Sequence, residues 1–330
     1  MRTLIVGLGS IGCRHLANLR NAELATDITI WHQHSKPETT EVPSQADRVV
    51  YSLEEALAAQ PEAVLITNPA LLHIETALTM ARQGTHLFIE KPLSNTLDGI
   101  DELMELCSRS SRVLMVGYNF RFYEPLQKIQ AVLSAGEIGR ILSIQARVGQ
   151  YLPNWRSNKD YRQGVSARKE LGGGVVLELS HELDYVRWLV GEVKAVSAQA
   201  GHLSDLEIDV EDTAEIILEF ENGAFGSIHM DMVDRAATRT CRIVGTDGTL
   251  TWDGPTHEVR IYSAARDAWS ELHPASKIDP NTMYLAELQH FFECIREKRM
   301  PVISAADGRR VLEIALAVRQ SAQERRTISL

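Results

Sequence analysis

The sequence predicts an α/β N-terminal domain of the doubly wound (Rossmann) type with a parallel sheet, and an α+β C-terminal domain with a large, open, mostly antiparallel sheet. Three observations predict this fold. Apolar runs alternate with helical patterns up to about residue 120, and strand-like runs joined by tight turns follow. The length of 330 residues exceeds what one ordinary core holds. We therefore place a first domain at residues 1–120 and a second domain at residues 121–330.

The first domain is predicted from fully apolar strands that are separated by amphipathic helices. Such a pattern is typical of βαβ units, whose parallel sheet is covered on both faces. Right-handed crossovers then give the doubly wound arrangement. The predicted strands are Thr3–Val6, Ile28–Trp31, Arg48–Tyr51, Ala63–Thr67, His86–Glu90 and Val113–Val116. The predicted helices between them include Leu53–Ala59, Leu71–Gln83 and Leu97–Ser108.

The second domain begins with a helix at Glu124–Ser134 and a strand at Ile141–Val148, before a polar and aromatic loop. A helix is expected at about 174–189, and two more at about 283–296 and 305–323. The dipeptides Asn222-Gly223 and Asp247-Gly248 favour hairpin turns, so the surrounding strands pair antiparallel. These strands are Val193–Gln199, Thr213–Phe220, Ala224–Met232 and Thr238–Val244.

Composition and charge exclude several classes of protein. The net charge of −10 argues against nucleic acid or an anionic membrane as the main partner. No segment approaches the ~20 apolar residues of a membrane span. The first residues predict a strand and a turn rather than a signal peptide, and the four cysteines are scattered, without zinc spacing. We therefore expect reduced thiols in a cytoplasmic protein.

The first predicted strand runs into a glycine turn of the kind that binds dinucleotides. Gly7 permits a tight turn, Gly9 lets the backbone approach a pyrophosphate, and Gly12 lets helix and strand pack closely. The following helix presents free N–H groups to the phosphates, so Ser10 and Ile11 are also candidate cofactor contacts. The alternative is that these glycines serve packing only.

The end of the second strand bears on the choice between NAD(H) and NADP(H). An acidic residue there would bind the ribose hydroxyls and repel a 2′-phosphate, but residues 31–36 contain none. Ser35 and Lys36 are instead able to hold a 2′-phosphate. The alternative is that Lys36 is a solvated loop residue. The sequence thus predicts an NAD(P)(H) cofactor and slightly favours NADP(H).

The fifth strand ends in Glu90-Lys91-Pro92, and ligands in open α/β sheets bind beyond such strand ends. Together with the glycine turn, an upstream segment and a downstream one, this motif resembles the glucose-fructose oxidoreductase / inositol dehydrogenase / rhizopine catabolism (Gfo/Idh/MocA) family over essentially the whole chain. The upstream segment contains Thr67-Asn68-Pro69, His73 and Gly84, and the downstream segment contains Gly172-Gly173-Gly174, His181 and Asp184.

The resemblance implies that Lys91 lies beside the nicotinamide and the substrate, and that Glu90 and Asn68 contact the cofactor. The resemblance also implies that four further residues are candidate cofactor contacts, namely Thr67, Pro69, His73 and Asn119. Pro92 restricts the residue before it to extended geometry, and the Lys91–Pro92 bond is a candidate for the cis form. The alternative for Lys91 is an exposed charge after a strand.

The downstream segment predicts a second set of catalytic candidates. Glu178, His181 and Asp184 are three residues apart and would project from one side of a helix. Oxidation of a secondary alcohol requires a base for the hydroxyl proton, and a histidine titrates in the right range. A metal site and a merely structural His181 are the alternatives. The family's commoner pattern has an Asp four residues before the His, so the role of Glu178 is open.

Two further stretches are predicted to bind substrate. Asn119 and Arg121 end the sixth strand, where the resemblance places substrate or nicotinamide contacts. The loop that follows the strand at 141–148 is rich in aromatic and cationic side chains, which suit sugar surfaces and anionic groups respectively. Its candidates are Trp155, Arg156, Tyr161, Arg162 and Arg168. We expect an anionic sugar such as a sugar acid or a nucleotide-sugar; an ordinary surface or subunit-contact loop is the alternative.

These observations favour a reversible sugar or polyol dehydrogenase with Lys91 and His181 as the acid/base pair. A redox-neutral epimerase, lyase or glycosidase with tightly bound NAD is one alternative, and a non-catalytic dinucleotide-sensing protein is another. We also expect a homodimer or homotetramer, because apolar side chains on the strand at 213–220, such as Ile216, Leu218 and Phe220, need covering.

Overall fold

The computed structural model describes residues 1–33, 44–156 and 160–330. They divide into two compact units. The first unit comprises Met1–Asn119 and Pro280–Arg309, and the second comprises Phe120–Asp279 and Arg310–Leu330. The chain first passes from one unit to the other between Asn119 and Phe120. The segment Pro280–Arg309, however, lies in the first unit, whereas the sequence boundary assigns it to the second domain.

The first unit contains a six-stranded parallel sheet with the strand order β3-β2-β1-β4-β5-β6. This is the order of the doubly wound dinucleotide-binding fold, so the predicted fold class is confirmed. Every residue of β4, β5 and β6 is buried, as a sheet covered on both faces requires. The strands are β1 (Arg2–Val6), β2 (Asp27–Trp31), β3 (Arg48–Val50), β4 (Ala63–Ile66), β5 (His86–Glu90) and β6 (Leu114–Gly117).

The helices of this unit pack in pairs, α1 against α8 and α3 against α4. Helix α2 starts at a capping box in which Ser52 and Glu55 satisfy each other's backbone N–H groups. The helices are α1 (Ser10–Asn21), α2 (Leu53–Ala58), α3 (His73–Ala81), α4 (Ile100–Arg109) and α8 (Asn281–Glu297).

The second unit contains a nine-stranded sheet with the strand order β14-β13-β12-β11-β7-β10-β9-β8-β15. All neighbouring strands are antiparallel except β7 and β10, which run parallel. The central strands are β7 (Ile141–Gly149), β8 (Val193–Gly201), β9 (Thr213–Phe220), β10 (Phe225–Asp231), β11 (Thr238–Gly245) and β12 (Gly248–Asp253). The remaining strands are β13 (Val259–Ser263) and the two edge strands β14 (Ala268–His273) and β15 (Ile328–Ser329). The sequence did not predict the ranges of these three strands or of β12.

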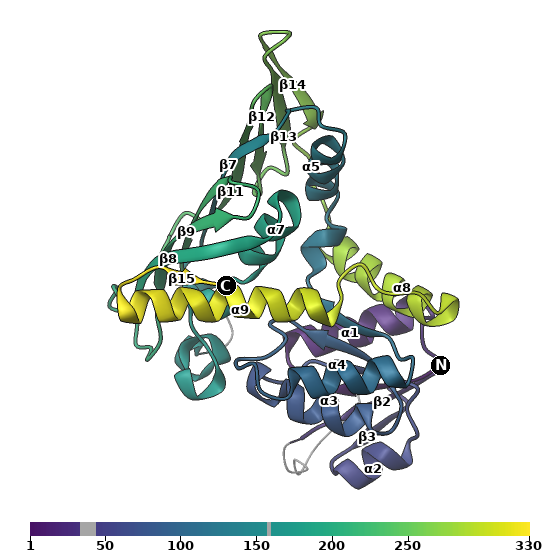
Figure 1. Ribbon diagram of the computed structural model, residues 1–330. Helices are drawn as coiled ribbons and strands as arrows, with labels where there is room; N and C mark the ends of the chain where they lie inside the picture. The colour runs from purple at the N-terminus through teal and green to yellow at the C-terminus, as the bar shows by residue number, and fades with distance from the viewer. Residues whose placement is uncertain (34–43, 157–159) are drawn as a thin grey trace. The chain divides into compact units, whose positions relative to one another are not determined.

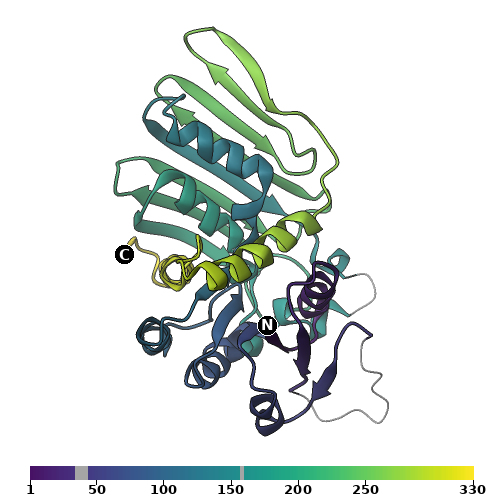
Figure 2. The same cartoon turned by 90° about the vertical axis from the view of Figure 1, so that its right-hand side faces the viewer.

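One face of this sheet carries helices. Helix α5 (Glu124–Ser134) packs on β14 and α7 (His181–Val190) packs on β7, and both views show the two helices on the same side (Figures 1 and 2). Helix α9 (Ala305–Glu324) ends the helical part of the chain. The side chains of Ile216, Leu218 and Phe220 are each only 1% exposed. The expectation that they need another subunit to cover them is therefore wrong.

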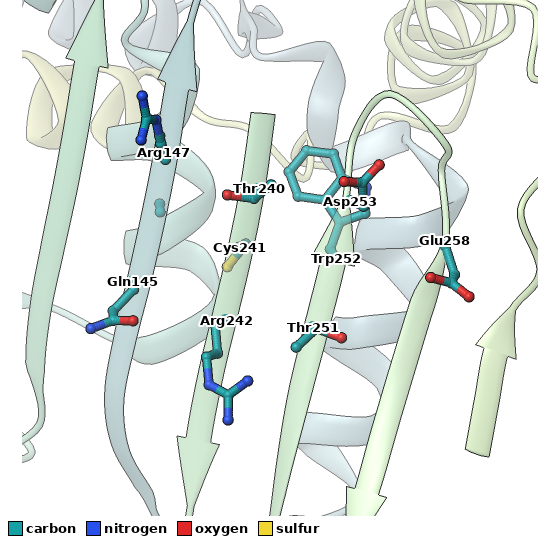
Figure 3. A pocket seen from close by; sticks show the side chains of 10 residues that line it. Gln145, Arg147, Thr240, Cys241, Arg242, Thr251, Trp252, Asp253 and Glu258 are labelled. Carbon is teal, nitrogen blue, oxygen red and sulfur yellow. The ribbon is translucent and has the colours of Figure 1, made fainter. Parts of the chain in front are cut away.

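The opposite face of the sheet carries polar side chains on strands β7, β11 and β12, where Figure 3 shows a concavity. Its volume is about 400 Å³. Gln145, Arg147 and Arg242 project from it, and none of the predicted site residues lies there. Of the helices in the described ranges, none is both long enough and apolar enough to cross a membrane.

Candidate active site

The geometry of the turn between β1 and α1 accounts for each of its three glycines. Gly7 has a φ of +90°, which a residue with a side chain rarely adopts. A Cβ on Gly12 would lie 2.3 Å from the carbonyl oxygen of Gly7 and 2.8 Å from Thr67 Oγ1. No atom of the described residues lies within 4 Å of the corresponding position on Gly9. Gly7 and Gly12 are thus needed for the fold, whereas the space beside Gly9 is open to a ligand.

Two substitutions separate these roles. Gly12→Ala should lower the free energy of unfolding by about 3 kcal/mol, because its methyl group meets backbone rather than a flexible side chain. Gly9→Ala should leave the melting temperature unchanged and weaken nicotinamide-cofactor binding by about tenfold or more, because its methyl group occupies the open space. Thermal unfolding and fluorescence titration measure the two effects. Equal loss of stability in both variants would contradict this assignment.

Thr67, a predicted cofactor contact, holds the glycine turn instead. Its hydroxyl lies 2.9 Å from the carbonyl oxygens of both Val6 and Gly7. Asn68 follows at the carboxyl end of β4 and is buried. Its Nδ2 donates to Gln33 Oε1 (2.8 Å), but its Oδ1 has no hydrogen-bond partner among the described residues. A buried acceptor without a partner fits a site that a ligand completes.

His73 links the Asn68 segment to the Lys91–Pro92 turn, whose peptide bond is cis. The ring is 1% exposed, with Nε2 2.8 Å from the carbonyl oxygen of Asn68 and Nδ1 3.0 Å from that of Pro92. Burial lowers the pKa of His73. Each ring nitrogen thus faces a backbone carbonyl oxygen, and the side chain joins the two segments. The cofactor contact of His73 stays a prediction.

The carboxylate of Glu90 also binds other groups of the first unit. Its Oε1 lies 2.6 Å from His15 Nε2, and its Oε2 accepts the backbone N–H of Lys91 (3.2 Å). Lys91 itself is half-buried at the carboxyl end of β5. Asn119 follows β6, is 2% exposed and has an Oδ1 without a hydrogen-bond partner among the described residues. Pro69 continues the chain from Asn68.

In the second unit, the predicted helix at 174–189 is broken into α6 (Val175–Glu178) and α7 (His181–Val190). Leu179 and Ser180 separate them, so Glu178 does not share one continuous helix face with His181 and Asp184. Glu182 and Asp184 lie in the first turn of α7, where acidic residues favour a helix start. Apolar residues recur at helical spacing on both sides of this point, so the sequence alone indicated one continuous helix. Glu178 Oε2 instead accepts the hydroxyl of Ser166 (2.8 Å).

His181 is stacked on Phe120, with ring centroids 4.7 Å apart and an interplanar angle of 24°. The guanidinium carbon of Arg239 lies 4.6 Å from the centroid of the same Phe120 ring. Arg239 is in turn paired with the fully buried carboxylate of Glu182 (2.8 Å). Sequence reasoning missed the stacking of His181 on Phe120 and the Glu182–Arg239 pair, because these residues are far apart in the chain and no motif joins them.

Arg121 and Asp184 form a buried ion pair. Arg121 Nε lies 3.1 and 3.0 Å from the two carboxylate oxygens of Asp184, and Nη2 lies 2.7 Å from Oδ1. The side chains are 7% and 0% exposed. The predicted substrate contact Arg121 and the predicted catalytic residue Asp184 are thus paired with each other in the structure.

The aromatic and cationic loop surrounds a cavity of about 430 Å³. Trp155, Arg156 and Tyr161 line it together with Ser166, which joins the cavity to Glu178. Arg162 and Arg168 are not among the lining residues. Arg162 is paired with Asp160 (2.9 Å) and Glu207 (2.9 Å), and these two carboxylates raise the pKa of its guanidinium. Arg168 Nε donates to the carbonyl oxygen of Arg162 (2.8 Å).

Ser35 and Lys36 lie outside the described residues. Among the side chains that the structure describes, no three or more His, Cys, Asp or Glu residues are grouped so as to hold a metal ion.

The chain matches two models that describe one family of proteins. The model of an oxidoreductase family's NAD-binding Rossmann fold matches residues 1–118, and that of its C-terminal alpha/beta domain matches residues 130–330. Myo-inositol 2-dehydrogenase of Thermotoga maritima is 27% identical over 348 residues, which cover 100% of this chain and 98% of that protein.

Solved structures show the same fold. Levoglucosan dehydrogenase in complex with NADH is 23% identical with a TM-score of 0.87, and the match covers 100% of this chain and 98% of the other. The WlbA dehydrogenase from Bordetella pertussis, in complex with NADH and UDP-GlcNAcA, is 24% identical with a TM-score of 0.83 and the same coverage.

Proposed function

Because the chain belongs to the Gfo/Idh/MocA family of oxidoreductases, we propose that it is an NAD(P)-dependent dehydrogenase of a sugar or polyol. The observation that carries this proposal is the glycine turn of β1 and α1, where Gly9 leaves open the space that a pyrophosphate needs. The acceptors Asn68 Oδ1 and Asn119 Oδ1, which lack partners among the described residues, fit the same cofactor.

Each proposed catalytic residue has one task. A bound nicotinamide cofactor supplies or accepts the hydride. His181 takes the hydroxyl proton of the substrate during oxidation and returns it during reduction, because an imidazole exchanges protons near neutral pH. The Lys91 ammonium donates a hydrogen bond to the same substrate oxygen and stabilises the charge that develops there. Phe120 orients His181 by stacking.

We propose a substrate that carries an anionic group. The support is the cavity with Trp155 and Tyr161 for the sugar surface and Arg156 for the anion. Arg162 and Arg121 are paired within the protein and add little to such a site. The proposed function is tested by incubating the protein with NAD⁺ or NADP⁺ and a panel of inositols, aldoses, sugar acids and nucleotide-sugar acids. Formation of reduced cofactor supports it, and higher kcat/KM for the acids supports the anionic group.

We also propose that NADP(H) binds at least as tightly as NAD(H). Strand β2 ends at Trp31, the next five residues contain no acid, and Lys36 is able to pair with a 2′-phosphate. Such a charge-assisted contact contributes about 1.5–3 kcal/mol, which is at least about tenfold in affinity. Fluorescence titration of both cofactors should show that Lys36→Glu reverses the order. Lys277→Glu, the same charge change at an exposed lysine of the second unit, should not. Tenfold tighter binding of NAD(H) to the wild type would contradict this proposal.

A homodimer or homotetramer remains our proposal for the assembly. The open face of the second unit's sheet supports this assembly, because it exposes 53% of Ile217 and 60% of Phe225. These residues lie on the paired strands β9 and β10. Light scattering at micromolar concentration should give a multiple of the chain mass, and Ile217→Asp should lower it. A monomeric wild-type protein would contradict this proposal.

A further inference from the structure

A buried pair of side chains in the first unit connects the helix of the glycine turn to the strand that ends at Lys91. His15 lies on α1, three residues after Gly12, and is fully buried. Glu90 is the last residue of β5 and is 7% exposed. His15 Nε2 lies 2.6 Å from Glu90 Oε1. The proposed mechanism assigns neither residue a task.

The imidazole ring of His15 is held in place by aromatic neighbours. It meets Phe88 edge to face, with centroids 5.3 Å apart, and Tyr284 of α8 in the same manner at 6.3 Å. Arg14 lies over the Tyr284 ring, with its guanidinium carbon 4.3 Å from the centroid. The hydrogen bond to Glu90 therefore starts from a ring that packing has already oriented.

The second carboxylate oxygen of Glu90 acts on Lys91. It accepts the backbone N–H of Lys91 at 3.2 Å. Gly117, which pairs with Glu90 across β5 and β6, leaves the room for this arrangement: a Cβ there would lie 3.3 Å from Glu90 Cδ and Oε2. One carboxylate thus joins helix α1 to the peptide group that carries the catalytic lysine.

We propose that His15 and Glu90 are positioning residues that fix the direction of the Lys91 side chain relative to helix α1. Glu90 holds the backbone N–H of Lys91, and the carbonyl oxygen of the next residue, Pro92, lies 3.0 Å from His73 Nδ1. The backbone is thus held on both sides of Lys91, which restricts the direction of its Cα–Cβ bond. A misplacement of 1 Å in such a group is able to cost about 10²-fold in rate. This inference rests on the proposed function, because it assumes that Lys91 acts on substrate.

The test compares three variants of helix α1. His15→Leu removes the donor, whereas His15→Gln keeps an N–H group near the position of Nε2. Asn18→Ala is the matched control: Asn18 lies one turn further along α1, is 4% exposed and donates to Asn281 (3.2 Å), without touching Glu90. We expect His15→Leu to lower kcat by about tenfold or more, with cofactor Kd and substrate KM changed by less than about threefold. We expect His15→Gln to recover most of kcat. Asn18→Ala should lower the melting temperature and leave kcat unchanged.

A second readout does not depend on turnover. Reductive methylation with ¹³C-formaldehyde gives each lysine an NMR signal, and Lys91→Arg identifies that of Lys91. His15→Leu should shift or broaden the Lys91 signal in the cofactor-free protein, and His15→Gln and Asn18→Ala should not. An unchanged Lys91 signal with wild-type kcat in His15→Leu overturns the proposal. So does a loss of kcat that follows the melting temperature across all three variants. Absence of hydride transfer in the wild type overturns the proposed function instead, and the NMR comparison still decides whether His15 orients Lys91.

Discussion

Replacing Lys91 by alanine is expected to lower kcat by about 10²-fold or more while leaving cofactor binding nearly intact. Lys91 is half-buried at the carboxyl end of β5, where ligands of parallel sheets bind. The glycine turn and Asn68, which we propose to hold the cofactor, do not depend on its ammonium group. The loss should therefore fall on the chemical step, since the developing charge on the substrate oxygen has no donor.

Steady-state kinetics and a cofactor titration measure the two parts of this expectation. Lys277→Ala, at an exposed lysine of the second unit, is the control for removal of one positive charge. Wild-type kcat in Lys91→Ala would remove Lys91 from the mechanism. A loss of cofactor affinity as large as the loss in kcat would make it a binding residue only.

Replacing Asp184 by asparagine is expected to destabilise the protein more than any other single change considered. The carboxylate is fully buried and neutralises the equally enclosed guanidinium of Arg121. Removal of one partner of such a pair leaves a buried charge without compensation and costs about 3–5 kcal/mol. Denaturant unfolding should show this loss in the free energy of unfolding.

The chain offers a matched control for this variant. Asp160 also binds an arginine through both carboxylate oxygens, Arg162, but the two side chains are 32% and 49% exposed. Asp160→Asn should therefore cost far less, because solvent replaces the lost partner. The double variant Arg121→Met/Asp184→Leu should recover much of the loss, since it removes both buried charges. Similar losses in Asp184→Asn and Asp160→Asn would show that burial of the first pair has little weight.

Much of the fold was predictable because its signals are local. The six strands of the first unit are short apolar runs, and the turn Asn222-Gly223 joins β9 and β10 as predicted. Strand β14 gave no such signal, since of its six residues only His273 is buried. An edge strand with little burial leaves little apolar periodicity in the sequence.

The candidate site likewise contains features with local sequence signals and features that depend on residues far apart in the chain. The glycine turn and the cis Lys91–Pro92 bond follow from neighbouring residues, so the sequence was sufficient to predict them. The pairs Arg121–Asp184 and Glu182–Arg239 join residues 63 and 57 positions apart. An arginine in a sequence does not indicate whether its partner is a substrate or a buried carboxylate. This is why Arg121 and Arg162 were predicted to bind substrate, whereas the structure pairs both within the protein.

The most direct test of the central claim follows the hydride itself. The best substrate of the panel is prepared with deuterium on the carbon that bears the reacting hydroxyl group. It is then incubated with the protein and oxidised cofactor for a single turnover, and both products are analysed by mass spectrometry. The account predicts reduced cofactor that carries the deuterium and a ketone product that has lost it. Deuterium that stays in the sugar or returns to it, with no net reduction of added cofactor, would contradict the account and indicate a redox-neutral enzyme.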